Sequence, residues 1–135
     1  MTIAYLDANV FVYASVSQQE IGKRCRSLVQ DIEAGSVRAV SSSLTFDELV
    51  WVVKRLRGYE AAIEAGAAFL NMVGLKITEV DVETLNTALQ LINEHRLNPR
   101  DSIHAASAIL AGAEYILSDD SDFDKLKQKL KRKTI

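Results

Sequence analysis

The stretch Ile3-Ala4-Tyr5-Leu6-Asp7 opens the chain with four apolar residues and closes with an acid. A short run that is apolar on both faces is typical of a strand buried inside a parallel sheet. Two later segments repeat this apolar pattern, one alternates, and the last residues fit an edge strand. The expected strands cover residues 3–6, 37–40, 75–80, 115–117 and 133–135.

Between these segments, apolar residues recur at helical spacing. Gly35, Gly58 and Gly74 are placed to end three helices, and Pro99, the only proline, is placed to begin another. The expected helices cover residues 9–14, 21–32, 44–56, 59–73, 82–98 and 99–112, with a short one from 123. Because strands and helices alternate, the order predicts an α/β fold: a three-layer α/β/α sandwich with a central parallel β-sheet of four to five strands.

The length of 135 residues favours one domain over residues 1–135, and 48% hydrophobic residues are enough for a real core. No apolar run is long enough for a membrane span, and no signal-peptide pattern appears. The single cysteine, Cys25, is expected to be a small buried hydrophobe. These features indicate a cytoplasmic protein as the default.

Four acids fall near the expected carboxyl edge of the sheet, where loops of a parallel sheet bind ligands. Asp7 follows the first strand, Glu48 lies early in the helix after the second, and Asp120 follows the fourth. Asp101 starts a helix that follows another helix, so its place at this edge is inferred. Each acid also has a purely structural role open to it, as a helix cap, a capping box or a turn residue.

Gathered in one crevice, such carboxylates repel one another unless a cation lies among them. Mg²⁺ and Mn²⁺ prefer carboxylate and water oxygens, and the sequence has no cysteine or histidine cluster that indicates zinc. Both histidines, His95 and His104, are interpreted as incidental. A divalent cation at this edge would lower the pKa of a bound water and neutralise charge on a phosphodiester.

The residues resemble the PIN-domain nucleases and, among them, the VapC-type toxins of toxin–antitoxin pairs. Four motifs in order carry the resemblance: Tyr5–Asn9, Leu44–Leu49, Pro99–Ala106 and Ile116–Asp124. The resemblance implies a PIN-like fold and metal-binding or water-orienting roles for Asp7, Glu48, Asp101 and Asp120, with Asp122 as a helper. It also implies that Asn9 and Ser118 are hydrogen-bond partners of these acids.

For function, the resemblance implies an Mg²⁺- or Mn²⁺-dependent ribonuclease, a homodimer, and inhibition by a cognate antitoxin of a type II pair. The identity of the fourth acid stays open, because either Asp119 or Asp120 could fill that role. The basic tail from Lys125 to Lys133 and the cluster Lys54, Arg55 and Arg57 are candidate RNA-backbone contacts or simply solvated surface.

The residues are also compatible with two other functions. Phospho-acceptor domains, of the receiver or phosphatase type, also place an aspartate after the first strand of a parallel sheet. They need a lysine near a late strand end, however, and Ser118 to Phe123 contains none. The other alternative is a PIN-like module that binds RNA or protein and keeps the acids without cutting.

Overall fold

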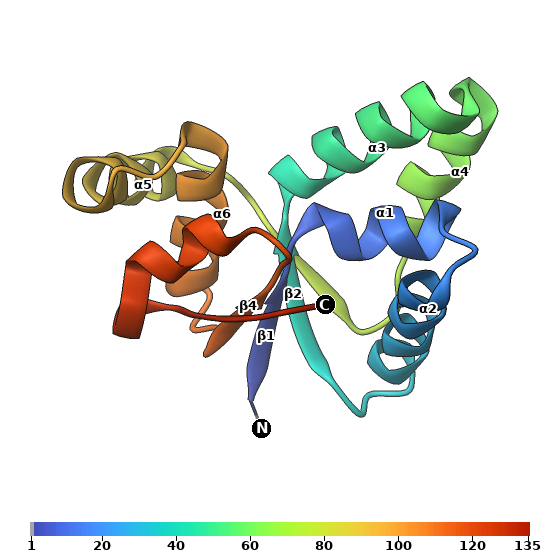
Figure 1. Cartoon of the computed structure of the whole chain (residues 1–135), viewed down its shortest axis with the longest axis horizontal. Helices are drawn as coiled ribbons and strands as arrows, with labels where there is room; N and C mark the ends of the chain where they lie inside the picture. Colours follow the sequence, from blue (N-terminus) through green and yellow to red (C-terminus); the bar gives the residue numbers. More distant parts are fainter. Residues whose placement is uncertain (1) are drawn as a thin grey trace.

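The computed structural model describes residues 2–135, and within them one sheet of five parallel strands runs through the molecule (Figure 1). The strands lie in the order β3-β2-β1-β4-β5. Their bounds are β1 Ile3–Leu6, β2 Arg38–Ser42, β3 Leu75–Thr78, β4 Tyr115–Leu117 and β5 Lys131–Lys133. The predicted parallel α/β sheet is confirmed, with the upper of the two expected strand numbers.

Helices connect the strands and cover both faces of the sheet. They are α1 Ala8–Val16, α2 Glu20–Glu33, α3 Ser43–Arg57, α4 Tyr59–Leu70, α5 Val82–His95, α6 Pro99–Leu110 and the 3-10 helix η1 Ser121–Lys129. In Figure 1, α1 and α2 lie to the right of the sheet, α5 and α6 lie to the left, and the α3–α4 hairpin projects upward. The predicted three-layer arrangement is therefore confirmed.

Alternating side chains of the central strand divide the core into two halves. Ala4 and Leu6 pack with α1, α2, α3 and α4, whereas Tyr5 packs with α5, α6 and η1. This alternation follows from the two-residue period of a strand. It explains why β1 has to be apolar at every position, because both of its faces are buried.

The order of the strands creates one switch point. From β1 the chain moves outward through β2 to β3, and it then crosses to the other side of β1 to form β4 and β5. Ala4 pairs with Ala39 of β2 on one side and with Tyr115 of β4 on the other. The carboxyl ends of β1 and β4 meet at this switch point, which is where open α/β sheets bind ligands.

Several element boundaries differ from the sequence prediction. The helix expected over 82–98 ends at His95, because Arg96 adopts a left-handed backbone (φ 56°) whose N–H bonds to Ile92. The helix expected over 59–73 ends at Leu70, and the strand expected over 75–80 ends at Thr78. The last strand covers Lys131–Lys133 rather than 133–135.

Gly74 allows the close turn into β3. It has φ +85°, and a Cβ atom built on it would lie 2.3 Å from the carbonyl oxygen of Ile32. Only glycine fits this combination of conformation and contact. Among residues 2–135, no helix is long and apolar enough to cross a membrane.

Candidate active site

Asp7 stands at the carboxyl end of β1, beside the switch point. One carboxylate oxygen accepts a hydrogen bond from the backbone N–H of Ala8 (2.7 Å), and the other accepts from the hydroxyl of Ser118 (2.7 Å). Ser118 is fully buried after β4, and its Oγ accepts a bond from the backbone N–H of Asp120 (3.0 Å). Asp7 is thus a helix cap, as one of the structural alternatives predicts, and it is also fixed against the loop that carries Asp120.

Glu48 reaches the same place from the second turn of α3. Its carboxylate contacts Nε2 of His104, which extends from α6. The structural alternative for Glu48, a capping box with Thr45, is wrong, because α3 begins earlier, with Ser42 as its N-cap. Thr45 is buried inside the helix, where its hydroxyl accepts a bond from Ser41 Oγ (2.8 Å). Glu48 therefore does not bond back to its own helix start and points toward α6.

His104 is central to the site, so its interpretation as an incidental residue is wrong. The ring is 1% exposed, and Nε2 lies 3.8 Å from Asp7 Oδ1. Nδ1 lies 2.6 Å from the hydroxyl of Tyr5, which in turn lies 2.8 Å from Ser42 Oγ. The Tyr5 hydroxyl donates to Ser42 Oγ, so Nδ1 of His104 donates to the Tyr5 oxygen. The protonated ring, which the upward shift of its pKa favours, also donates from Nε2 to Glu48.

A signal for His104 was present in the sequence. His104 follows Asp101 by three residues, so the two share one face of a helix. The neighbours Ala105, Ala106 and Ala108 are small and apolar, which predicts that this helix packs closely on the sheet. An acid and a histidine on the buried side of one helix favour a site residue over a packing residue.

Asp101, Asp120 and Asp122 form a second acidic group beside the first. One carboxylate oxygen of each lies within 4.8 Å of the others. Asp120 caps η1 by accepting a hydrogen bond from the backbone N–H of Asp122 (2.9 Å). All three are partly buried. Asp7, Glu48 and His104 Nε2 lie equally close to one another, but Nε2 donates to Glu48, so this group offers a metal ion only its two carboxylates.

The pKa values show how strongly the acids interact. Burial, with the charges of Asp120 and Asp7, raises the pKa of Asp101 to about 6. Burial also raises the pKa of Asp7, against the opposing charge of His104 and the hydrogen bond from Ser118. For His104, burial lowers the pKa, but the bond to Glu48 and the charge of Asp7 outweigh it and the net shift is upward. The two acidic groups therefore form one electrostatic unit.

Comparison with known proteins identifies the family. A family model described as the PIN domain matches residues 4–129. The chain belongs to the PIN domain family. No curated protein sequence matches this PIN domain.

Solved structures with the same fold share little sequence with this PIN domain. VapC20 of Mycobacterium tuberculosis, a sarcin-ricin loop cleaving toxin, has a TM-score of 0.75 at 16% identity over 93% of this chain and 95% of that chain. VapBC2 of Rickettsia felis, bound to promoter DNA, has a TM-score of 0.73 at 18% identity over 99% of each chain. FitAcB of Neisseria gonorrhoeae has a TM-score of 0.72 at 15% identity over 96% and 95%. At these identities the likeness establishes the fold.

Two predicted residues of the PIN domain lie apart from the acids. Asp119 points away, accepting hydrogen bonds from the hydroxyl of Tyr13 (3.1 Å) and the backbone N–H of Ile135 (3.3 Å). Of the two candidates for the fourth acid, Asp119 and Asp120, it is Asp120 that lies with Asp101 and Asp122. Asn9 is exposed on the first turn of α1, and within residues 2–135 its side chain makes no hydrogen bond to the acids.

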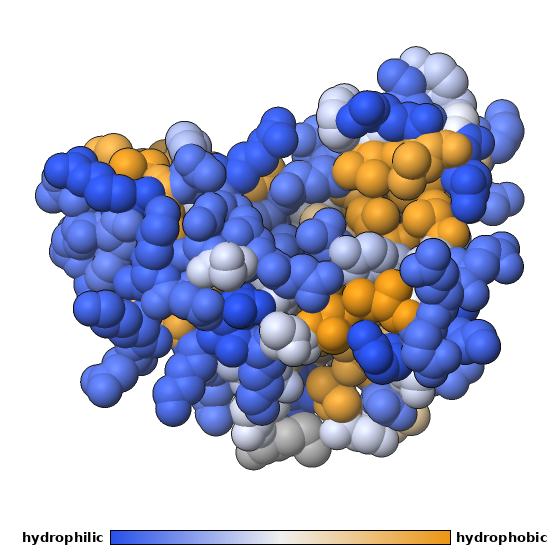
Figure 2. Space-filling model, viewed as in Figure 1, coloured by the Kyte–Doolittle hydropathy of each residue, from blue (hydrophilic) through white to orange (hydrophobic). Residues whose placement is uncertain are grey.

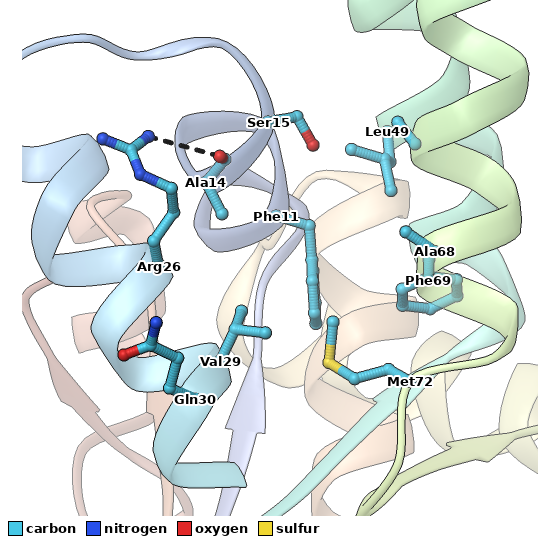
Figure 3. A pocket seen from close by; sticks show the side chains of 11 residues that line it. Phe11, Ala14, Ser15, Arg26, Val29, Gln30, Leu49, Ala68, Phe69 and Met72 are labelled. Carbon is cyan, nitrogen blue, oxygen red and sulfur yellow. Dashed lines mark hydrogen bonds between the residues drawn. The ribbon is translucent and has the colours of Figure 1, made fainter. Parts of the chain in front are cut away.

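A separate apolar hollow of about 320 Å³ lies where α1, α2, α3 and α4 meet (Figure 3). Phe11, Phe69 and Met72 point into it, and Arg26 stands at its edge, where it donates to the carbonyl of Ala14 (3.3 Å). Figure 2 shows apolar residues gathered over this side of the molecule, whereas the surface around it is largely hydrophilic. The hollow contains none of the clustered acids, so it is suited to holding an apolar group rather than to hydrolysis.

Proposed function

We propose that this PIN domain, residues 1–135 as a single domain, is a metal-dependent ribonuclease and the toxin of a type II toxin–antitoxin pair. The observation that carries the proposal is the meeting of Asp7, Glu48, Asp101 and Asp120 at the switch point of the sheet. The family match and the structural likeness to VapC toxins support it. No serine, cysteine or histidine nucleophile is needed for this chemistry.

The donor set fits a hard divalent cation. Asp101, Asp120 and Asp122, whose carboxylate oxygens lie within 4.8 Å of one another, would hold it together with Asp7 and Glu48, and all of these offer only carboxylate oxygens. We propose Mg²⁺ or Mn²⁺ as the ion, because both bind such oxygens together with water. When bound, the ion lowers the pKa of water and offsets negative charge on the phosphodiester.

The protein's own residues position this chemistry. Ser118 and the Ala8 N–H hold Asp7, and His104 holds Glu48, so both carboxylates have one fixed orientation. A fixed carboxylate orients an attacking water by accepting its hydrogen bond. Ser118 and His104 therefore act on the reaction through the acids and do not need to touch RNA.

Cleavage of RNA tests the function directly. The purified chain is incubated with a panel of structured and single-stranded RNAs in Mg²⁺, in Mn²⁺ and in chelator, beside Asp7→Asn and Asp101→Asn variants. We expect cleavage with metal, none with chelator, and none with either variant. Binding of RNA without cleavage of any panel member would support the alternative of a non-catalytic module. Stable phosphate on Asp7 after a phospho-donor would support the phospho-acceptor, which is not favoured because Ala8 and Ser118 engage both Asp7 oxygens.

We further propose an antitoxin as protein partner and a homodimer as the assembly. Solved relatives include a toxin–antitoxin complex from Klebsiella pneumoniae and VapBC-1 from Haemophilus influenzae. The apolar hollow lined by Phe11, Phe69 and Met72 offers a place for an apolar antitoxin segment. Co-expression with candidate antitoxins, followed by light scattering of the free chain and of the complex, measures the oligomeric state and the antitoxin binding. A substitution Phe69→Ala that leaves complex formation unchanged would contradict the hollow as the docking place.

A further inference from the structure

A stripe of side chains leads along α3 away from the acids. Glu48, Trp51, Val52 and Arg55 are spaced by three, four and seven residues, so they lie on one face of the helix. Glu48 stands among the acids at one end of this stripe. At the other end the Arg55 guanidinium lies 4.7 Å from the centre of the Trp51 ring. The stripe thus connects the proposed catalytic centre to an aromatic platform.

A hollow of about 240 Å³ opens between this stripe and the first turn of α6. It is lined by Asp47, Glu48, Trp51, Val52 and Arg100. Glu48 forms a wall of both this hollow and the acidic site, and Arg100 directly precedes Asp101. Whatever occupies the hollow is therefore adjacent to the acids.

Trp51 is the most unusual residue of this lining. Its side chain is 53% exposed, although an indole carries more apolar surface than any other side chain. It is also the only tryptophan of the chain. An exposed indole with a guanidinium on its ring, beside a hollow, is an arrangement that accepts a second flat ring by stacking.

We propose that the Trp51–Arg100 hollow binds one unpaired nucleotide of the RNA, next to the bond that is cut. This inference rests on the proposed nuclease function and adds a substrate subsite to it. The base stacks on Trp51, and Arg100 and Arg55 contact the neighbouring phosphates. Asp47 and Glu48 repel phosphate, so the base, rather than the backbone, enters the hollow.

Size and charge favour a nucleotide over a protein partner. Pockets for drug-sized ligands have volumes of roughly 300–1,000 Å³, and this smaller hollow suits a single base. The buried centre of a protein–protein interface is depleted in charged residues. Here two carboxylates and an arginine line a hollow of five residues, and a second arginine covers the tryptophan.

The emission of Trp51 reports on the hollow without any added label. Wild-type protein in chelator, which prevents cleavage, is titrated with a short single-stranded RNA and with the same backbone lacking its bases. We expect the RNA to quench Trp51 emission in a saturable manner, and the abasic strand to leave the emission unchanged. Because Trp51→Ala and Trp51→Phe contain no tryptophan, their RNA affinity is compared with that of the wild type by the anisotropy of a labelled RNA. Trp51→Ala should weaken RNA binding about 5- to 150-fold, which corresponds to ~1–3 kcal/mol for one stacked base. Trp51→Phe should recover part of that loss.

Two controls distinguish stacking on Trp51 from the loss of any exposed ring and from a loss of folded protein. Tyr59→Ala removes another exposed aromatic ring of the α3–α4 hairpin, one that carries Lys54 on its face but does not line the hollow, and it should leave affinity unchanged. Thermal unfolding of each variant checks that the fold is retained. If the wild type cleaves RNA while its Trp51 emission is not quenched, and Trp51→Ala cleaves RNA with an unchanged KM, the subsite proposal is overturned and the nuclease proposal stands. Emission that changes with protein concentration in the absence of RNA would assign the hollow to a second copy and also overturn it.

The combination of the quenching and cleavage results distinguishes a failure of the subsite proposal from a failure of the nuclease proposal. If the RNA quenches Trp51 but no RNA is cut with metal present, the subsite is supported and the nuclease proposal fails. If neither quenching nor cleavage occurs with any RNA of the panel, both proposals fail.

Discussion

Replacing Asp101 by asparagine should stabilise the metal-free protein while abolishing its activity. The pKa of Asp101 is raised from 3.8 to about 6 by burial and by the charges of Asp120 and Asp7. Below the unfolded value Asp101 is protonated in both states and has no effect on stability. As the pH rises from there to about 6, the unfolded state binds fewer protons than the folded state, so stability falls. Above a pH of about 6, the full loss of stability caused by ionised Asp101 remains.

The size of the penalty follows from the shift. A rise of about two pKa units corresponds to roughly 3 kcal/mol at most. Asp101 is only partly buried, so solvent screening reduces this to about 1 kcal/mol. For a domain of this length, such a gain raises the melting temperature by about 3–5 °C. Asparagine has nearly the same shape and keeps a donor for Asp120, so little is lost in exchange.

Urea unfolding of wild-type protein and Asp101→Asn in chelator measures the effect. We expect the variant to be the more stable protein at about pH 7.5 and the two to be nearly equal at about pH 4, where the wild-type carboxyl is protonated. Added Mg²⁺ should stabilise the wild type through binding and leave the variant unchanged, which reverses the order. A variant that is less stable in chelator, or a difference that does not depend on pH, would show that the carboxylates do not repel one another as described.

Three other substitutions test separate parts of the structure. His104→Ala empties a buried position and removes the ring that contacts Tyr5 and the partly exposed Glu48. It should lower stability by roughly 2–4 kcal/mol and kcat/KM by ~10–100-fold, with partial rescue by His104→Gln. Unchanged kinetics would remove its role in holding the acids. Asp120→Asn should abolish cleavage whereas Asp119→Asn keeps most of it, and the opposite result in the same assay would mean that the two residues have exchanged roles. Gly74→Ala should destabilise the protein more than Gly112→Ala in urea unfolding, because a Cβ at Gly74 lies 2.3 Å from a backbone oxygen and one at Gly112 meets open space. Equal costs would contradict the close turn at Gly74.

The sequence was sufficient to predict the position of those site residues that directly follow the end of a strand. Asp7 and Asp120 come directly after β1 and β4, and parallel strands bring their carboxyl ends to one edge whatever the loops do. Glu48 was also expected there, although its local pattern with Thr45 favoured a capping box. The start of α3 at Ser43 decides between these interpretations, and a boundary shift of that size is not readable from helical spacing alone.

The contacts of His104 were beyond sequence reasoning for a different reason. Its partners Tyr5 and Glu48 are 99 and 56 residues away, on a strand and on another helix. The three-residue spacing from Asp101 favours a site role for the ring, but it does not identify the residues that the ring contacts. Only the packing of α6 on the sheet brings Nδ1 within 2.6 Å of the Tyr5 hydroxyl. The left-handed Arg96 that ends α5 is similar, since no glycine or asparagine marks that residue.

The two acidic groups of the site differ in what holds them. In the first, Asp7 and Glu48 each accept bonds from fixed donors, and His104 offsets part of their charge. In the second, burial and then the charges of Asp120 and Asp7 raise the pKa of Asp101, so its negative charge is not balanced by the protein. A divalent cation would bind most favourably beside carboxylates whose mutual repulsion is not offset by the protein, as in the second group. The carboxylates of the first group are already held in one orientation. We infer that the second group supplies the driving force for metal binding, while the first supplies the geometry of the reaction.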